Sequence, residues 1–374
     1  MNVEPIESRE DASLLAVGDV ALLHPLDSAS PESGEVWDYL RSSDLATGNL
    51  ELPLTVSGAC VDKVITLRAN PEVAPSLRET GIGLVTLANN HTLDYGAEGL
   101  YDTLSALRDA GVGAVGCGRD LEEAMQPTWV SLGETSVAVF GLASTLPPGF
   151  AAEPGRPGIA PVRARSRFYV DAVTLDEQPG MSPWVETEVV EEDLQRACER
   201  VESTREEADL VVIHIHWGVP NGWCAAFQGP LADYQRPLGH ALIDAGADLV
   251  LGHHPHVVHG VERYKDGLIA YSLGHFLFHS MSEGREIELT NSYPPYNVAS
   301  LKTGVARQAV ILELRVARNL MTSVTFRPVR LNAQGEPEFA RGAEANIVLS
   351  RLAEYSSRMD TKVEVRDQEA CVAL

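Results

Sequence analysis

The sequence predicts an α/β fold with a full hydrophobic core, and three observations support this prediction. Short apolar runs that suit buried strands recur along the chain, and amphipathic helical patterns lie between several of them. The chain has 374 residues, 44% hydrophobic and 22% charged, so it can bury a large core and is not disordered throughout. Its 31 glycines and 6% aromatic residues indicate Val-, Leu- and Ala-rich elements joined by many tight turns.

Six short apolar runs are expected to form strands. They are Leu14–Val17, Leu45–Gly48, Leu84–Ala88, Val137–Leu142, Leu210–Ile215 and Leu249–Gly252. Three helices are marked by apolar residues at helical spacing: Leu100, Leu104 and Leu107 in the first; Leu194, Cys198 and Val201 within 190–208; and Val348, Leu352, Tyr355 and Met359 near the end. The first helix should end at Gly111, a common helix stop.

Two segments depart from this alternation of strands and helices. Residues 145–185 contain seven prolines, so we expect a Pro-rich loop or insertion there. From 305 to 331 apolar and polar residues alternate around Arg318-Asn319, which predicts an antiparallel hairpin; with the last helix it would occupy 305–361. Because no internal repeat is visible, we expect a single domain over residues 1–374.

The charge excludes two classes of partner. With 29 Lys+Arg against 53 Asp+Glu, the net charge of −24 would repel both nucleic-acid phosphates and anionic membrane surfaces. The acidic N-terminus lacks a secretory signal, and no stretch suits a membrane span. Five cysteines without a C-x-x-C pair suit a reducing compartment. We therefore expect a cytoplasmic protein without nucleic-acid or membrane partners, of unknown oligomeric state.

Acid, amide and imidazole side chains gather where five of the expected strands end. They are Asp19; Asn49 and Glu51; Asn90 and His91; His214 and His216; and His253, His254 and His256. Ligand sites in open α/β sheets lie outside the carboxyl ends of strands. Because side chains alternate along a strand, His214 and His216 share one face, as would His254 and His256 if that segment were extended.

These placements together favour a metal site, although single residues have structural interpretations. Asp19 alone could be a turn or helix-capping residue, and His216 alone a hydrogen-bonded core histidine. Three imidazoles within residues 253–256 would be costly unless coordinated or solvated. Imidazole, carboxylate and amide donors without a thiolate suit a divalent transition metal: Mn²⁺, Fe or Zn²⁺. The candidates exceed one tetrahedral site, so the natural arrangement is two ions bridged by a carboxylate, although one ion remains open.

A series of motifs in fixed order resembles a known family. The motifs are GD-V, GNLE-x-P-x-T, ANNH-x-x-D-x-G, HWG, Q-x-x-L-x-x-x-LIDAGADLVLGHHPHV and YSLG-x-F. They resemble the CapA poly-γ-glutamate capsule-biosynthesis family, of the calcineurin-like metallophosphatase superfamily, over residues 13–279. The resemblance implies a four-layer α-β-β-α sandwich of two mixed sheets, with a dinuclear site at the strand ends.

The resemblance also implies roles for the matching residues. Those expected to bind metal are Asp19, Asn90, His216, His254 and His256, with Glu51 as the bridging carboxylate. His91 would protonate the leaving group. The residues expected to support these groups from behind are Asn49, Asp94, His214 and His253.

Two departures from the family pattern concern imidazoles. Phosphoesterases of the superfamily begin with D-x-H, but Ala21 stands where that histidine would be, and His24 is either a substitute or a surface residue. The family's S-L-G-N-F has His275 in place of Asn, so His275 could add a ligand or a second acid/base group. We assign catalysis to His91 and His275.

Three functions follow as hypotheses. The first is a metal-dependent hydrolase acting on a small anionic substrate, a phosphoester, by metal-activated water. The second is metal-dependent amide-bond chemistry on a γ-glutamyl or related peptide, and the third is a non-catalytic accessory protein of capsule biosynthesis. A substrate-binding patch could be formed by Arg156, Arg163, Arg165 and Arg167, since guanidinium groups bind carboxylate or phosphate; the alternative is a solvated loop.

Overall fold

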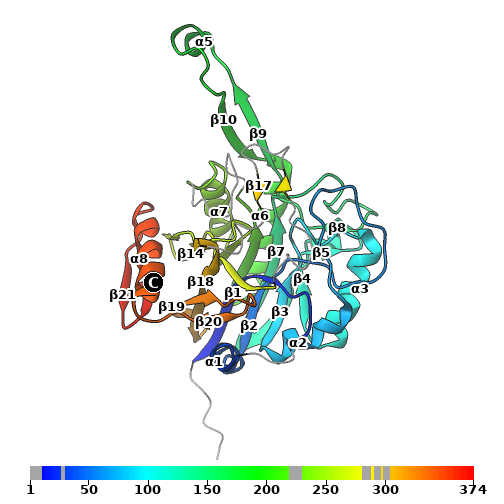
Figure 1. Ribbon diagram of the computed structural model, residues 1–374, viewed down its shortest axis with the longest axis vertical. Coiled ribbons are helices and arrows are strands. Elements are labelled where there is room, and N and C mark those ends of the chain that lie inside the picture. Colours follow the sequence, from blue (N-terminus) through cyan, green and yellow to red (C-terminus); the bar gives the residue numbers. More distant parts are fainter. Residues whose placement is uncertain (1–10, 27–29, 219–229, 280–287, 290–295, 298–303) are drawn as a thin grey trace, which may run out of the picture.

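Two mixed β-sheets form the framework of the protein (Figure 1). The computed structural model describes residues 11–26, 30–218, 230–279, 288–289, 296–297 and 304–374. Within these residues the larger sheet has ten strands in the order β21-β22-β19-β18-β1-β2-β3-β4, with β15 paired to β1 and β20 paired to β19. The smaller sheet has six strands in the order β13-β14-β12-β11-β7-β6.

The strands of the larger sheet come from both ends of the described chain. Their bounds are β1 Ala12–Ala21, β2 Leu45–Leu50, β3 Ile82–Thr86, β4 Gly113–Val115, β15 His275–Phe278, β18 Gln308–Ala317, β19 Leu320–Leu331, β20 Pro337–Phe339, β21 Val363–Arg366 and β22 Glu369–Val372. β1 lies parallel to β2 and β15 and antiparallel to β18. The sheet is therefore mixed around its N-terminal strand.

The smaller sheet has a parallel centre and antiparallel edges. Its strands are β6 Thr128–Leu132, β7 Thr135–Ala143, β11 Leu210–His216, β12 Leu249–His253, β13 Val261–Tyr264 and β14 Gly267–Ala270. Parallel pairing joins β7, β11, β12 and β14, while β6 and β13 are antiparallel to their neighbours. Three short pairs complete the strands: β5 Cys117–Gly118 with β8 Gly158–Ile159, β9 Ala164–Tyr169 with β10 Trp184–Val189, and β16 Glu288–Leu289 with β17 Tyr296–Asn297.

The described helices lie between the strands along the chain. They are α1 Pro31–Arg41, α2 Ala74–Glu79, α3 Gly96–Asp109, α4 Leu121–Ala124, α5 Ala172–Glu177, α6 Glu191–Arg205, α7 Gln235–Asp244 and α8 Gly342–Ser357, with 3-10 turns at Pro71–Val73 and Gly304–Arg307. The start of α1 shows why local sequence specifies these bounds. The Ser30 side chain accepts from the Ser33 amide, and Pro31 follows at the first helical position.

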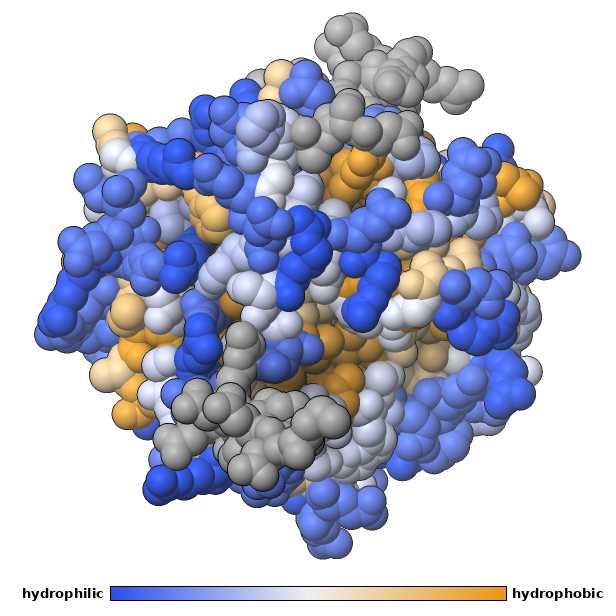
Figure 2. Space-filling view, turned by 90° about the horizontal axis from the view of Figure 1, so that it is seen from below, coloured by the Kyte–Doolittle hydropathy of each residue, from blue (hydrophilic) through white to orange (hydrophobic). Residues whose placement is uncertain are grey.

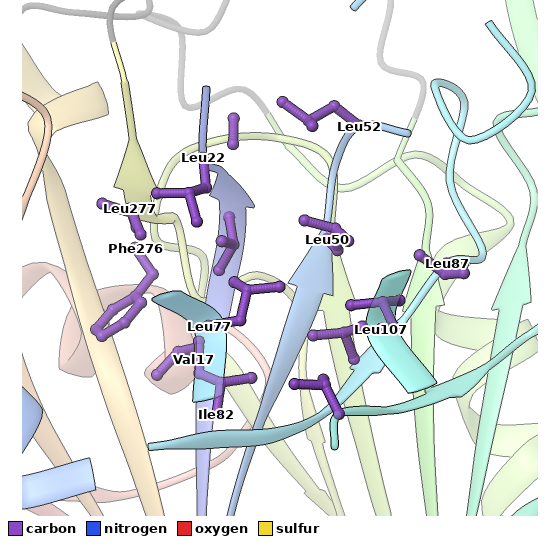
Figure 3. Packing of buried hydrophobic residues seen from close by; sticks show 14 of the residues in the cluster. Val17, Leu22, Leu50, Leu52, Leu77, Ile82, Leu87, Leu107, Phe276 and Leu277 are labelled. Carbon is purple, nitrogen blue, oxygen red and sulfur yellow. The ribbon is translucent and has the colours of Figure 1, made fainter. Parts of the chain in front are cut away.

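Both faces of the larger sheet are buried, because alternate residues of β1 enter different cores. Leu15 and Val17 belong to a cluster formed with α1, α2 and α3, shown in Figure 3. Leu14 and Ala16 belong to a second cluster, which lies between the two sheets. This pattern explains why the β1 sequence is a nearly continuous apolar run rather than an alternating one.

Two further sets of contacts complete the packing. The second cluster also contains residues of β7, β11 and α8, including Val137, Val212 and Leu352. A third cluster joins the other face of the smaller sheet to α6 and α7, through residues such as Val201 and Leu242. α1, α2 and α3 therefore cover the outer face of the larger sheet, and α6 and α7 cover that of the smaller sheet. The two inner faces pack against each other, and α8 packs with them.

The structure confirms the α/β fold and the six expected strands, with changed bounds. The first strand extends to Ala21, so Asp19 lies within it rather than after it. The last helix ends at Ser357, which leaves Met359 beyond it. The alternation over 305–331 corresponds to β18 and β19, which pair antiparallel around Arg318-Asn319. The pair β21 and β22 was not predicted from the sequence.

The Pro-rich segment 145–185 is more regular than the loop expected from its composition. Residues around Phe150 and Ile159 pack into the first cluster. The remainder forms an arm: β9 and β10 pair antiparallel and project from the body of the molecule, with α5 at the tip (Figure 1). Several large apolar side chains of this arm are exposed, among them Phe168, Val173 and Trp184.

The opposite end of the molecule has an ordinary polar surface. Seen from below in Figure 2, it is covered mainly by hydrophilic side chains, with apolar ones in scattered patches. None of the helices in the described ranges has the length and apolar character needed to span a bilayer.

We predict that Gly18→Ala destabilises the fold next to Asp19. A Cβ on Gly18 would lie 1.8 Å from the carbonyl oxygen of Gly274, which accepts from the Asp19 amide at 3.0 Å. The backbone must shift, so the free energy of unfolding should fall by about 3 kcal/mol. Urea unfolding measures this change. Gly34→Ala in α1 is the control, because no atom lies within 4 Å of its added Cβ. Equal urea midpoints for the two variants would contradict the prediction.

Candidate metal centre

Strand register places the polar residues of both sheets beside one another. Asp19 in β1 is the Cα partner of Asn49 in β2, and His216 in β11 is the partner of His253 in β12. The backbone amide of His254, directly after β12, donates to Asp19 of the other sheet at 3.4 Å. All five residues are buried. The carboxyl ends of strands from the two sheets therefore converge on one point, as the sequence predicted.

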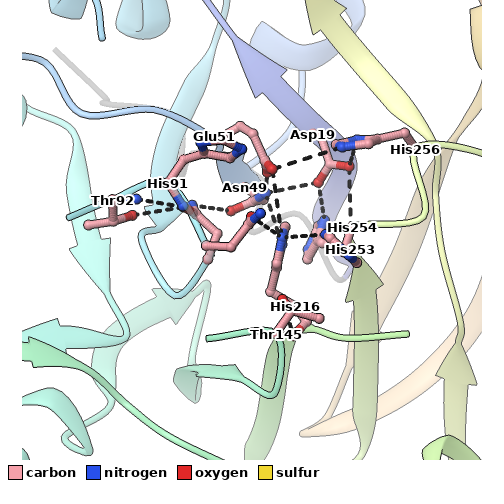
Figure 4. Close-up of polar contacts among 12 residues, drawn as sticks. Asp19, Asn49, Glu51, His91, Thr92, Thr145, His216, His253, His254 and His256 are labelled. Atoms are coloured by element: carbon pink, nitrogen blue, oxygen red, sulfur yellow. Dashed lines mark hydrogen bonds and ion pairs between the residues drawn. The ribbon is translucent and has the colours of Figure 1, made fainter. Parts of the chain in front are cut away.

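Asn49 connects the two carboxylates of this cluster (Figure 4). Its Nδ2 donates to Asp19 Oδ1 at 2.8 Å and to Glu51 Oε2 at 2.5 Å. The other Glu51 oxygen, Oε1, is buried and has no hydrogen-bond partner among the described residues. It lies 3.6 Å from His216 Nε2 and 4.0 Å from His256 Nε2. An unpartnered carboxylate oxygen therefore faces two imidazoles.

The imidazoles and Asn90 surround these carboxylates. His216 Nε2 lies 3.0 Å from Asn90 Oδ1 and 3.1 Å from His254 Nδ1, and His256 Nδ1 lies 2.8 Å from Asp19 Oδ2. The segment after β12 is not extended, because His254 and His256 have φ values of 99° and 57°. Non-glycine residues seldom adopt this left-handed region, and such strain is typical of functional sites.

The electrostatics of the two carboxylates suit a bound cation. Burial alone would raise the pKa of Asp19, but the neighbouring His253 and His256 imidazoles hold it well below its ordinary value. Burial and the charge of Asp19 raise the pKa of Glu51 well above its ordinary value. Ligand atoms of Asp19, Glu51 and His216 all lie within 4.8 Å of one another. A divalent cation bound there would neutralise both carboxylates, so the donor set fits a metal ion.

Two histidines of the cluster, His216 and His254, are in the form that binds metal. Burial lowers the pKa of His216 well below its ordinary value, and the nearby His254 lowers it further. Burial and His256 lower the pKa of His254 to about 3. Both rings are therefore neutral at physiological pH, and only a neutral imidazole has a lone pair for coordination.

The loop after β3 holds His91 beside Asn90. His91 Nδ1 lies 2.7 Å from Asp94 Oδ2, and Lys63 Nζ lies 2.7 Å from the other Asp94 oxygen. Burial lowers the pKa of His91, while the hydrogen bond to Asp94 opposes this change. Asn89 organises the loop: its Oδ1 accepts from the His91 and Thr92 amides, and its Nδ2 donates to Asn49. Neither Lys63 nor Asn89 was predicted as a site residue.

A chain of buried polar groups reaches Asp19 from behind. Thr47 Oγ1 lies 3.1 Å from His214 Nε2, and His214 Nδ1 lies 2.9 Å from His253 Nε2. His253 Nδ1 in turn lies 3.4 Å from Asp19 Oδ1. His253 therefore lies beside Asp19, and His214 contacts His253 rather than Asp19 itself.

The structure also brings His275 to the cluster but places His24 at its edge. His275 is the Cα partner of Asp19, and its ring stacks on His256 with centroids 4.4 Å apart. His24 stacks on His279 at 3.8 Å, and among the described residues it contacts none of the expected metal ligands.

Three of the four arginines proposed to bind substrate have acidic partners. Arg163 forms a bidentate pair with the buried Asp193 (2.6 and 2.8 Å). Arg156 pairs with Glu153 and Arg167 with Glu188. Arg165 and Arg167 lie on β9 of the arm and are exposed. Within the part of the chain that the structure describes, none of these guanidinium groups contacts the polar cluster around Asp19 and Glu51.

We predict that Arg163→Gln affects stability rather than substrate binding. Burial would raise the pKa of Asp193, but the Arg163 hydrogen bonds hold it below its ordinary value. The pair therefore stabilises the protein above the pKa of an unfolded Asp, about 4, and this contribution is lost as the pH falls through the lower folded pKa. At pH 7 the variant should lose about 1–3 kcal/mol in urea unfolding, with a smaller difference in acid.

Arg165→Gln on the exposed part of β9 is the matched control and should change stability by less than about 0.5 kcal/mol. Unchanged stability of Arg163→Gln together with a raised KM would instead favour the substrate-binding role.

Residues 13–280 match the protein family described as "Bacterial capsule synthesis protein PGA_cap". The match covers the cluster residues from Asp19 to His275. The chain belongs to this family. Membership confirms the CapA resemblance inferred from the motifs. The matched segment also contains the strands that supply the cluster residues.

Curated relatives agree with membership in the PGA_cap family. Capsule biosynthesis protein CapA of Bacillus anthracis is 30% identical over 288 residues, which are 74% of this chain and 62% of that protein. PGA biosynthesis protein CapA of Bacillus subtilis is 29% identical over 271 residues, 70% of this chain and again 62% of the relative. A probable polyglutamine synthesis accessory protein of Mycobacterium tuberculosis is 31% identical over 243 residues, 62% of this chain and 55% of that protein. The matched segment thus spans less than two thirds of each of these relatives.

Proposed function

We propose that this chain is a metal-dependent hydrolase that acts on a small anionic substrate, a phosphoester, with water as the attacking group. The observation that carries the proposal is the unpartnered Glu51 Oε1, which faces His216 and His256 within a buried cluster. We also propose that the two packed sheets and their outer helices are the four-layer sandwich of the calcineurin-like superfamily, as one domain over residues 1–374.

The proposed ligands are the donors that converge on this point: Asp19, Glu51, Asn90, His216, His254 and His256. Their mixture of carboxylate, amide and imidazole suits Mn²⁺, Fe or Zn²⁺. When bound, such an ion lowers the pKa of water and stabilises charge that develops on the reacting group. Asn49 fixes both carboxylates through its Nδ2.

His91 is the proposed proton donor. Its Nδ1 donates to Asp94, which fixes the ring orientation and stabilises the imidazolium form, and the Nε2–H of that form would protonate the leaving oxygen. His91 follows the ligand Asn90 directly, so the two functions are carried by one loop.

The net charge of −24 favours a small substrate over a polymer. A long polyanion would meet this repulsive field along its whole length, whereas a short anion needs only the local charge of the bound metal.

The names of the relatives favour a second candidate, metal-dependent chemistry on the amide bond of a γ-glutamyl peptide. Two relatives are described as capsule or PGA biosynthesis proteins, and a third as an accessory protein of polyglutamine synthesis. The same metal and the same His91 would serve this reaction, because both reactions require an activated water and a protonated leaving group.

Metal analysis coupled to substrate assays tests the proposal. The purified chain is assayed with Mn²⁺ on phosphomonoesters, phosphodiesters and γ-glutamyl peptides, beside a His254→Ala/His256→Ala double variant as the metal-deficient control. Phosphoester hydrolysis that disappears together with the metal in the double variant is the expected result. Cleavage of γ-glutamyl peptides would favour the second candidate, and bound metal without turnover of either class would favour an accessory role. A double variant with full metal content would contradict the assignment of His254 and His256 as metal ligands.

A further inference from the structure

His275 has an uncommon hydrogen-bonding state for a buried histidine. Its ring is fully buried, and Nδ1 donates to the carbonyl oxygen of Ala306 at 3.0 Å. Nδ1 therefore carries the proton, and Nε2 carries a lone pair. This Nε2 is buried without a hydrogen-bond partner among the described residues. A buried acceptor without a partner is costly, so a partner is expected there.

The surroundings of His275 indicate that a cation is this partner. His275 is the Cα partner of Asp19 across the β1–β15 pair, and its ring stacks on His256. His256 itself lies 2.8 Å from Asp19 Oδ2. A histidine that binds metal typically donates its other ring N–H to a carboxylate or a backbone carbonyl, as His275 does to Ala306.

The donors of the cluster fall into two groups that share Glu51. Asn90 and His254 lie within 3.1 Å of His216 Nε2, whereas His256 lies 2.8 Å from Asp19 Oδ2 and stacks on His275. Asp19 also lies within 4.8 Å of Glu51 and His216. Glu51 Oε1 faces both groups, at 3.6 Å from His216 and 4.0 Å from His256. One ion cannot take this many donors in a tetrahedral site, but two ions bridged by Glu51 can.

We infer that His275 Nε2 is a ligand of a second metal ion, which it holds together with Asp19 and His256. The inference rests on the proposed metal centre and names a ligand that replaces the imidazole absent at Ala21. It assigns His275 to metal binding rather than to acid/base catalysis.

The test measures metal stoichiometry and Mn²⁺ magnetic resonance of the reconstituted chain. Wild type should bind two Mn²⁺ per chain and show the spectrum of a coupled pair. His275→Asn should bind one Mn²⁺ with an uncoupled spectrum, and its affinity for the second ion should fall more than about 100-fold, since even supporting residues cost 10–100-fold.

His279→Asn is the matched control, because His279 is also buried and has an unpartnered Nε2. Its Nδ1 accepts from the Leu23 amide at 3.2 Å, so its Nε2 carries the proton and cannot bind metal. This variant should keep two ions. The melting temperatures of the metal-free variants report folding, and His275→Gln replaces His275→Asn if the latter does not fold.

Two bound ions in both wild type and the His275 variant would overturn the inference while leaving the proposed function intact. A single ion in wild type would also overturn it. Wild type that binds no metal would overturn the proposed function itself.

Discussion

Replacing His91 with alanine should lower turnover about 10²–10⁴-fold, the usual contribution of a positioned acid, while the metal content stays unchanged. The structural reason is that His91 adjoins the proposed ligand Asn90 but is itself held by Asp94 through Nδ1. The Asp94 carboxylate favours the imidazolium form of His91, whose Nε2–H is the proton to be transferred. Steady-state kinetics on the substrate identified in the assays, with metal analysis of the same sample, measures both quantities.

Asp94→Asn is the companion variant for His91. It preserves the size of the side chain but removes the charge that fixes the His91 ring and pairs with Lys63. A smaller loss of turnover, about 10–100-fold, is expected because the acid is still present but less well oriented. Loss of metal in His91→Ala would reassign His91 as a ligand.

Glu51→Gln should remove metal from the centre and abolish hydrolysis with it. Two adjacent cations repel each other, and a carboxylate between them offsets this repulsion where a neutral amide cannot. Metal analysis and activity should therefore fall together. Glu313→Gln is the control: Glu313 is also buried, but it lies in β18 and is hydrogen-bonded by Tyr39 and Arg315.

The same Glu51 substitution should have the opposite effect on the metal-free protein. Burial and Asp19 raise the pKa of Glu51, so the unfolded chain ionises this group more readily than the folded one. Stability of the metal-free protein is therefore lost as the pH rises above the unfolded pKa of Glu51, about 4.3, and through its higher folded pKa. Glu51→Gln lacks this penalty and should melt at a higher temperature than metal-free wild type at pH 7. Wild-type metal content and activity in Glu51→Gln would eliminate the bridging role.

Much of the fold and most of the proposed ligands could be predicted because their patterns are local. The apolar run before Asp19 and the run before His253 each specify a strand and its end within about ten residues. Parallel strands place their carboxyl ends at one edge, so Asp19 and Asn49 could be expected at one edge of a sheet. The contact of this edge with His216 depends on how the two sheets pack, which strand patterns do not specify.

The residues that escaped prediction depend on contacts between distant segments. Lys63 reaches Asp94 from a loop 31 residues earlier, and no local pattern distinguishes it from a surface lysine. The arm formed by β9 and β10 was not predicted, because the prolines of this segment indicate a loop. Composition does not show that two strands beside such a loop will pair. The left-handed backbone at His254 and His256 likewise cannot be predicted from alternation, which assumes an extended chain.

The position of β1 in the larger sheet has a consequence for the order of folding. β1 is made first among the described strands, yet it pairs with β15 and β18, and Asp19 meets His275 across a separation of 256 residues. Closing such a long loop is slow, so β1 pairs with β2 earlier than it pairs with β15 and β18. During synthesis, β1, β2 and β3 can pair early, while the edge of β1 that later receives β15 and β18 stays open until the last third of the chain emerges. The nascent chain must therefore keep that apolar edge from pairing with another chain, and Asp19 meets His275 only after this edge is closed.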